Sequence, residues 1–334
     1  MALRRWFLRV VDLLPLPGLR TQRLIAFLVI LTQGGISVTG AIVRVTASGL
    51  GCPTWPQCFP GSLVPTPHPE VAALHQWVEF GNRLLTFAVV LVTGLCFLAA
   101  LGARPRRPRL IRLALVQPLG VVAQAVIGGF TVLLGLVWWS VSVHFLVSMA
   151  LVWAAVVLVS AVTEGEEPPQ PVVPRAVRGL VATSSVVLGA LLLAGTFVTA
   201  AGPHSGDADT PRLAAGVPAM AQLHTDLLFA YLGLLAGLGF ALRAVAAPAV
   251  LQRRYAVLVA VVAAQGVLGG VQYALGVPEV LVSLHVLGAA LVTVAAAALW
   301  TATTRRAPAD PQAAPPPAPE ASPAADRPAL VERS

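Results

Sequence analysis

Eight apolar stretches, each about as long as a bilayer is thick, dominate this chain. A helix of about twenty apolar residues crosses the hydrocarbon core of a membrane, and only helices satisfy their own backbone hydrogen bonds in lipid. The sequence therefore predicts an all-α integral membrane protein with eight transmembrane helices. The predicted spans are roughly residues 22–45, 75–101, 110–134, 140–162, 179–201, 220–243, 255–275 and 280–301.

Charge is sparse, and arginine carries all of the positive charge. Charged residues make up 11% of the chain and hydrophobic residues 57%, whereas a soluble domain carries about a quarter charged residues. With the N-terminus inside, 19 of the 22 arginines lie in inner segments, and only Arg44, Arg83 and Arg212 lie outside. This positive-inside distribution predicts that both termini are cytoplasmic. Arginines in short clusters between spans indicate a membrane lipid environment and no nucleic-acid partner, despite the net charge of +8.

The chain also contains an internal repeat. Gln124-Ala-Val-Ile-Gly-Gly is followed, twenty residues after the Gln, by His144, and Gln265-Gly-Val-Leu-Gly-Gly is followed at the same spacing by His285. The repeat predicts two tandem four-helix halves. Because each half has an even number of spans, both keep the same orientation, related by an axis along the membrane normal. We predict a cytoplasmic N-terminal segment, a first half, a cytoplasmic linker, a second half and a disordered Pro/Ala-rich cytoplasmic tail, at residues 1–21, 22–162, 163–178, 179–303 and 304–334.

Four of the six histidines lie at or just inside the outer ends of even-numbered spans: His75, His144, His224 and His285. A lone histidine in a helix is more often structural, but ionisable groups at membrane depth are costly and tend to face the bundle interior with a function. His224 and His285 enter the second half from the same side, as two axial ligands of one haem do. The inner spans offer no nearby Cys or carboxylate to complete a zinc site. We therefore expect bis-histidine haem ligation there.

The first half is an altered copy of this site. The repeat places the partner of His144 near residue 83, where Asn82 is the nearest candidate. His75 lies two helical turns closer to the outer end on the same face. An open or weakly held iron is what a substrate haem or a reactive haem needs. The alternative is that this half has lost its haem site.

The same face of the second span carries a carboxylate. His75, Glu79 and Asn82 follow an i, i+4, i+7 pattern, Arg83 is next to them, and Arg44 ends the first span. Glu79 is thus a candidate for handling protons or for stabilising a cationic intermediate, with the two arginines in support. The alternative is a salt bridge between Glu79 and an arginine that holds the helix end.

Two cysteines, Cys52 and Cys58, lie close together in the outer loop after the first span. Outside the cytoplasm a close cysteine pair favours a structural disulfide, which we predict here. A redox-active or haem-delivering surface is the alternative for this proline-containing loop.

At this point the chain resembles the haem A synthase family, over the eight spans at roughly residues 22–303. The resemblance rests on Thr39-Gly-Ala-Ile-Val-Arg-Val-Thr-Ala-Ser-Gly-Leu-Gly-Cys-Pro-Thr-Trp-Pro-Gln-Cys, on Glu79-Phe-Gly-Asn-Arg, and on the helix-entry histidines. It implies an oxidoreductase that oxidises the C8 methyl group of haem O to the formyl group of haem A, for terminal oxidase assembly. The abundance of Ala, Arg, Gly and Pro is typical of a high-GC bacterium, so we expect a bacterial plasma membrane.

The resemblance implies two unlike haem sites. A b-type haem, the expected cofactor, maps onto His224 and His285, and the substrate haem maps onto His144 and the motif of the second span. The essential glutamate of the family falls on Glu79, and its outer cysteine pair falls on the two loop cysteines.

One position departs from the family pattern. The family motif usually reads Glu-x-x-His-Arg, so Asn82 stands where a histidine is expected. Either His75 substitutes for that ligand, or His144 holds the substrate iron alone.

The resemblance also implies partners: haem O as the substrate, and the haem O synthase and cytochrome oxidase assembly factors as proteins. Whether the chain forms a homo-oligomer stays open. Two other functions stay open as well, a diheme b-type electron carrier and a haem transporter or chaperone. The broken symmetry at Asn82 argues for two unlike sites and favours the enzyme. The glycine pairs, weak signals of broken transporter helices, are explained more simply by close helix packing.

Overall fold

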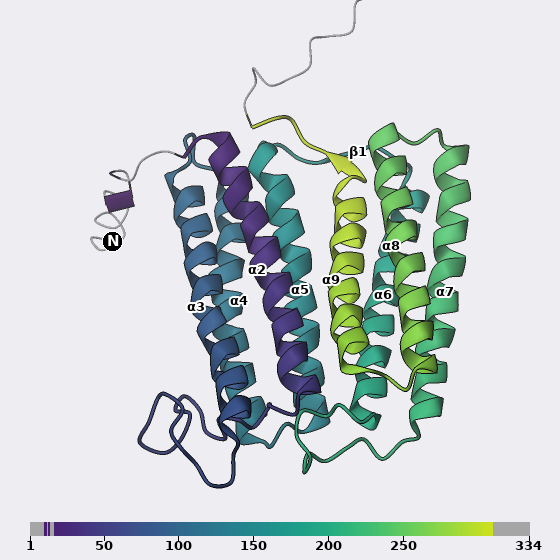
Figure 1. The fold of residues 1–334 in the computed structure, drawn as a ribbon. Helices are drawn as coiled ribbons and strands as arrows, with labels where there is room; N and C mark the ends of the chain where they lie inside the picture. The colour runs from purple at the N-terminus through teal and green to yellow at the C-terminus, as the bar shows by residue number, and fades with distance from the viewer. Residues whose placement is uncertain (1–9, 12, 14–16, 310–334) are drawn as a thin grey trace, which may run out of the picture.

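Eight long helices make up most of the described chain. The computed structural model describes residues 10, 11, 13 and 17–309 (Figure 1). Each long helix is apolar enough to cross a membrane, so the prediction of eight spans is confirmed, and the chain is a multi-pass membrane protein. Most of the predicted N-terminal segment, including Arg4, Arg5 and Arg9, lies outside the described residues. The long helices are α2 (Leu19–Val45), α3 (Ala73–Gly102), α4 (Pro108–Leu133), α5 (Trp138–Thr163), α6 (Arg175–Ala201), α7 (Val217–Ala244), α8 (Ala249–Ala274) and α9 (Glu279–Thr301).

The helices begin earlier than the apolar stretches that predict them. α8 begins at Ala249 although its apolar stretch begins near residue 255, and α6 begins at Arg175 although its stretch begins near residue 179. The segments before the apolar stretches hold exposed arginines such as Arg175 and Arg253, whose long side chains allow the charge to reach polar surroundings while the backbone stays helical. Hydropathy therefore locates the apolar length of each helix and misses the arginine-containing segments that precede it in α6 and α8.

The helices form two four-helix bundles side by side (Figure 1). α2 to α5 form the first bundle and α6 to α9 the second, and α9 packs against both α2 and α5 where the bundles join. In the first bundle, α2 and α4 each pack against both α3 and α5, so the ring of helices is closed. In the second bundle, α6 packs on α7 and α8 packs on α9, but the two pairs touch each other only sparsely. The second bundle is therefore the more open of the two.

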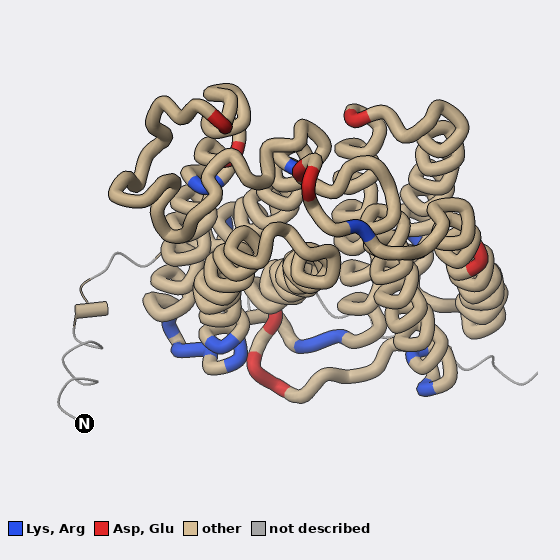
Figure 2. Tube along the Cα trace, turned by 90° about the horizontal axis from the view of Figure 1, so that it is seen from below, with Lys and Arg blue, Asp and Glu red and all other residues tan. Residues whose placement is uncertain are grey.

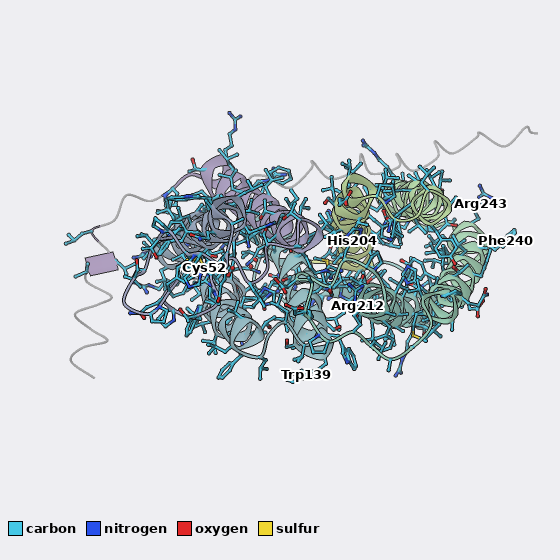
Figure 3. The ribbon with its side chains drawn as sticks, turned by 60° about the horizontal axis from the view of Figure 1, so that its bottom comes forward. Cys52, Trp139, His204, Arg212, Phe240 and Arg243 are labelled. Carbon is cyan, nitrogen blue, oxygen red and sulfur yellow. A yellow bond between two sulfur atoms is a disulfide. The ribbon has the colours of Figure 1, made fainter. Side chains whose placement is uncertain are left out.

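Most arginines lie at one end of the helices. Figure 2 shows them near the connections α3–α4, α5–α6 and α7–α8. The opposite end carries the two long loops, at residues 46–72 and 202–216. Large apolar side chains face outward at both ends of the helices: Trp139, in the first turn of α5, and Phe240, near the end of α7, point away from the bundles (Figure 3) and are 51% and 74% exposed. This is the surface expected of helices that face lipid. That the arginine-rich end is cytoplasmic stays a prediction.

The linker and the start of the tail pair with each other. β1 (Gln170–Pro171) and β2 (Thr304–Arg305) form a short antiparallel sheet. We expected disorder from residue 304 onward, but residues 304–309 are held against the linker, because each exposed segment supplies hydrogen-bond partners to the backbone of the other. The rest of the predicted tail, residues 310–334, lies outside the described residues.

Candidate functional site

The internal repeat appears in the structure as a repeated hydrogen bond. Gln124 in α4 donates from Nε2 to the carbonyl oxygen of His144 in α5 at 3.0 Å. Gln265 in α8 donates to the carbonyl oxygen of His285 in α9 at 2.8 Å. Both bonds link the residues that the sequence repeat aligned, so the two halves hold these two histidine-bearing turns in the same way.

Three of the predicted histidines also lie against a glycine of the preceding helix. A Cβ added at any of these glycines would come 2.9 to 3.2 Å from the Cε1 atom of the imidazole, closer than ordinary packing allows. The absence of a side chain thus makes the room that each ring occupies. The pairs are Gly128 with His144, Gly195 with His224, and Gly269 with His285.

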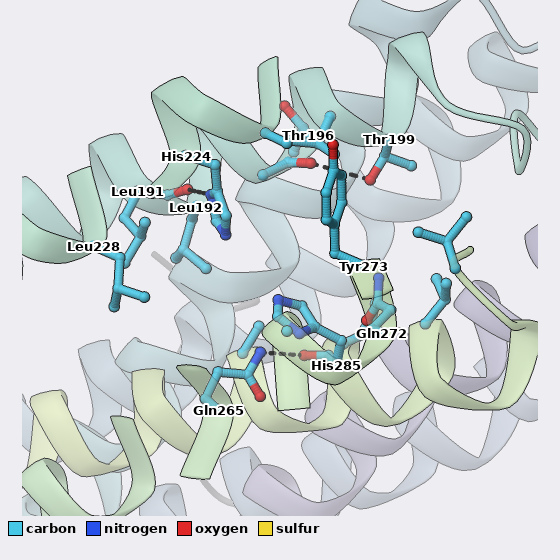
Figure 4. A pocket seen from close by; sticks show the side chains of 18 of the residues that line it. Leu191, Leu192, Thr196, Thr199, His224, Leu228, Gln265, Gln272, Tyr273 and His285 are labelled. Atoms are coloured by element: carbon cyan, nitrogen blue, oxygen red, sulfur yellow. Dashed lines mark hydrogen bonds between the residues drawn. The ribbon is translucent and has the colours of Figure 1, made fainter. Parts of the chain in front are cut away.

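A cavity of about 750 Å³ opens within the second bundle and extends to α2 and α5 of the first. His224 from α7 and His285 from α9 face each other across it, with ring centres 6.3 Å apart and ring planes inclined by 58° (Figure 4). Two imidazoles bonded to opposite sides of one metal ion at about 2 Å each have ring centres roughly 6 to 6.5 Å apart. The spacing therefore fits a haem iron between them. The deeper walls are aliphatic and include Leu188, Leu228, Val262 and Val292.

The ring nitrogens of this pair are suited to ligation. His224 donates from Nδ1 to the backbone oxygen of Leu191 at 3.0 Å, which leaves Nε2 as the free acceptor (Figure 4). His285 Nδ1 is buried and has no hydrogen-bond partner among the described residues. Nor does any cluster of three His, Cys, Asp or Glu side chains with metal-binding geometry occur in that part of the chain. The donor set is thus two imidazoles, which suits haem iron and leaves a tetrahedral zinc ion two ligands short.

The first-half candidates are placed differently. The Nδ1 atom of His144 is buried without a partner among the described residues, as at His285. Asn82 accepts a hydrogen bond through Oδ1 from the Thr39 hydroxyl at 2.7 Å. His75, in the first turn of α3, lies with Nδ1 2.9 Å from Ser48 Oγ. No ring contact joins His144 to His75 within residues 17–309, so the facing pair of the second half has no counterpart here.

Glu79 is locked between its own helix and the outer loop. Its Oε1 atom accepts from Arg83 Nη2 at 2.6 Å, and its Oε2 atom accepts from the backbone N–H of Cys52 at 2.5 Å. Arg83 also donates to the carbonyl oxygens of Cys52, Thr54 and Gln57. The salt bridge given above as an alternative therefore describes the geometry of Glu79, and it serves to dock the loop as well as to hold the helix end.

The predicted disulfide is present. Cys52 and Cys58 are joined with an S–S distance of 2.01 Å, and both are fully buried. The loop they close carries Trp55, which lies on α4: a Cβ at Gly129 would come within 2.5 Å of Trp55 Cδ2. The equivalent glycine of the second half, Gly270, lines the cavity, and a Cβ there would meet nothing within 4 Å. The loop therefore covers in the first half a surface that is open in the second.

Arg44 lies away from the first-half residues with which the sequence grouped it. It lines the cavity of the second bundle, together with His224 and His285. Its Nε atom donates to the backbone oxygen of His204 at 2.8 Å. The sequence could not indicate this position, because it depends on how the loop at residues 202–216 returns across the C-terminal end of α2.

Some residues that shape these sites stand in sequence motifs, but the motifs did not predict the contacts that these residues make. Gly128 and Gly269 stand in the repeated motif, and we attributed such glycine pairs to helix packing, whereas they face imidazole rings. Thr39 and Trp55 both lie in the stretch that carries the family resemblance, yet nothing in their spacing indicated a contact with Asn82 or Gly129.

Comparison with known proteins matches the chain to a protein family. The model of the COX15-CtaA family, described as cytochrome oxidase assembly protein, matches residues 23–208, which is more than half of the chain. Two similar curated proteins are the heme A synthases of Geobacillus kaustophilus (strain HTA426) and Geobacillus thermodenitrificans, 32% and 31% identical over 94 residues. The aligned stretch spans only 28% of this chain and 28% of each relative.

Proposed function

The chain belongs to the COX15-CtaA family of cytochrome oxidase assembly proteins, and from this membership we propose that it is a haem A synthase. In this proposal it is an oxidoreductase that converts the C8 methyl group of haem O to the formyl group of haem A for terminal oxidase assembly. The observation that carries the proposal is the facing pair of His224 and His285 within a mostly apolar cavity. Such a site belongs to a redox cofactor, and the other half carries an unlike site.

We propose that His224 and His285 hold haem b. Three features support this assignment: the distance between the rings, the hydrogen bond that frees His224 Nε2, and the glycines that make room for both rings. A bound haem b would supply one-electron chemistry, accepting or passing on the electrons removed from the substrate. The protein's part is to fix the ring orientations and to keep water out with aliphatic walls.

In the first half, we propose His144 as the strong ligand of the substrate iron and His75 as the second ligand, although among the described residues no ring contact joins these two as one joins His224 to His285. The Nδ1 atom of His75 contacts the Ser48 hydroxyl, and in the tautomer in which Nδ1 donates to it, as His224 Nδ1 donates to a carbonyl, Nε2 is the nitrogen left to bind. The Oδ1 atom of Asn82 is already engaged with Thr39. The proposal therefore gives Asn82 a packing role and assigns the second ligand to His75.

The carboxylate of Glu79 is the proposed catalytic group. Conversion of a methyl group to a formyl group takes up an oxygen atom from water or dioxygen and removes protons as well as electrons, and positive charge develops at the reacting carbon. A carboxylate fixed by Arg83 and by a backbone N–H is held ready to accept a proton or to stabilise that charge. Arg83 positions Glu79 and the disulfide loop together.

The proposal is tested by co-expressing the protein with a source of haem O, then extracting and separating the haems. The wild-type chain should yield haem A, and Glu79→Ala should yield none while still holding its b haem. Glu279→Ala is the matched control, because Glu279 is an exposed glutamate at the first position of α9. Haem B alone, with haem O unconverted by the wild type, would replace the synthase with a diheme electron carrier or a haem-handling protein.

A second pair of variants separates the two readings of the first half. His75→Ala should lose bound haem O and turnover, whereas Asn82→Ala should keep most of both. Turnover that survives in His75→Ala would mean that His144 holds the substrate iron alone.

A further inference from the structure

Among the described residues, Arg44 is the one Arg, Lys, Asp or Glu side chain that lines the cavity of the second bundle. It belongs to the last turn of α2, in the first bundle, and reaches the cavity of the other half. Its position is built by the loop at residues 202–216: Nε donates to His204 O, and Gly206 packs against the Arg44 side chain. The backbone N–H of Gly49 donates to Gly206 O at 2.9 Å, which ties this loop to the end of α2. Figure 3 shows His204 near the middle of the molecule, between the two bundles.

The guanidinium of Arg44 has no counter-charge among the residues that the structure describes. Among residues 17–309, no carboxylate lies within 4.0 Å of it, although Asp207 and Asp209 stand in the same loop. Within the described residues, only the Nε atom of the Arg44 guanidinium makes a hydrogen bond, so both of its Nη groups are available. A guanidinium held inside a membrane protein is costly unless an anion pairs with it. This end of the cavity therefore holds a positive charge that lacks a paired anion.

A second unpaired donor lies on the same cavity wall. The Thr210 hydroxyl is buried, with the residue 6% exposed, and has no hydrogen-bond partner within the described residues. Buried hydroxyls in native proteins are nearly always paired, so a missing partner is expected here. The planar N–H fork of an arginine beside a hydroxyl is a donor set that suits a carboxylate.

We propose that the outer end of this cavity is a carboxylate-binding subsite, in which Arg44 and Thr210 hold the acidic side chains of the macrocycle ligated by His224 and His285. This inference rests on the proposed haem b site. It fixes the orientation of the ligand: the carboxylate edge faces the loop at residues 202–216, and the apolar edge lies among the aliphatic walls below. It also means that the second-half site is completed by a residue of the first half, so a bound macrocycle joins the two bundles.

The test compares iron protoporphyrin IX with its dimethyl ester, which keeps the iron and the ring but lacks both carboxylates. The full-length protein, purified without haem in detergent, is titrated with each, and binding is followed by the absorption of iron with two histidine ligands. The wild type should bind the acid about tenfold or more tightly than the ester, since hydrogen bonds to charged groups are worth that much. Arg44→Gln should bring the ratio close to one, Arg44→Lys should keep part of it, and Thr210→Val should lower it less.

The matched control is Arg212→Gln. Arg212 lies in the same outer loop, is exposed, and donates to Gly202 O without lining the cavity, so its loss should leave the acid-to-ester ratio unchanged. If the wild type binds acid and ester equally through the two histidines, the carboxylate subsite is wrong and the haem site stands. If His224→Ala and His285→Ala leave the wild-type absorption unchanged, the proposed haem site itself is wrong. The wild-type ratio and the Thr210→Val ratio decide the question even where Arg44→Gln fails to fold.

Discussion

At the residue scale, glycine and histidine act as a unit in this protein. The pattern that pairs Gly269 with His285 recurs at Gly128 with His144, and a third pair is formed by Gly195 and His224. A helix position without a side chain lets an imidazole lie close to the neighbouring helix. At His224 the carbonyl oxygen of Leu191 also fixes the ring orientation, whereas at His285 the Gln265 amide holds the backbone carbonyl of the same turn. A ring held in this way is already oriented for a metal before any ligand arrives.

Two adjacent glycines allow a sharp test of this arrangement. Gly269→Ala places a Cβ 2.9 Å from His285 Cε1, so the ring must move, whereas Gly270→Ala places a Cβ with nothing within 4 Å. We expect the first change to lower haem b content by about tenfold, the scale of losses on disturbing the residues that orient a metal ligand, and the second to leave it unchanged. The measurement is haem bound per purified chain, with its absorption spectrum. Equal haem content in the two variants would show that the glycine does not position the ring.

At the element scale, the disulfide loop is docked on α3 by charge as well as by its covalent bond. Arg83 donates to three carbonyl oxygens of the loop, and Glu79 accepts from the N–H of Cys52. Arg83→Gln removes the charge-assisted bonds and leaves the disulfide in place. Since the Arg83 side chain is 21% exposed, we expect the opening free energy of the loop to fall by about 1 to 3 kcal/mol.

Hydrogen exchange at residues 51–58 measures that opening, because local exchange reports the free energy of local unfolding. Exchange in Arg83→Gln should be between about fivefold and about a hundredfold faster than in wild type, since every 1.4 kcal/mol is about tenfold. Arg212→Gln, which changes an arginine of the other outer loop, should leave it unchanged. Unaltered exchange in Arg83→Gln would mean that the disulfide alone fixes the loop.

Two neighbouring glycines of α4 contact different partners: Gly128 lies against His144 and Gly129 against Trp55. Substitutions at the two positions can therefore test the disulfide loop and the ligand site separately. Gly129→Ala would push a Cβ to 2.5 Å from Trp55, and Gly128→Ala would push one to 3.2 Å from His144. We expect Gly129→Ala to accelerate exchange in the disulfide loop with haem O binding retained, and Gly128→Ala to weaken haem O binding with the loop undisturbed. Hydrogen exchange and a haem O titration on both variants check this. The same response from both would indicate that loop and ligand site move together.

At the scale of the whole molecule, the sequence predicts what is periodic and misses what depends on the loop paths. The eight spans follow from apolar length, and His144 and His285 follow from a spacing that occurs twice. The positions of Arg44 and Trp55 could not be predicted, because each side chain contacts a segment far away in the sequence or belonging to the other half. The same holds for Asn82: its identity departs from the family pattern, but only the fold brings the Thr39 hydroxyl to it.

The orientation of the whole bundle is the remaining prediction, and two independent features give the same answer. The arginine-rich connections lie at one end of the helices, which the positive-inside rule assigns to the cytoplasm. The Cys52–Cys58 disulfide lies at the other end, where an oxidising compartment would maintain it. Alkaline phosphatase needs disulfides to become active, so a fusion after Pro69 should be active and one after Arg106 inactive. A green fluorescent protein fused after Ser334 should fluoresce. Phosphatase activity from the Arg106 fusion would invert the topology, and the proposed sites, which lie near the loop end of the bundles, would then face the cytoplasm.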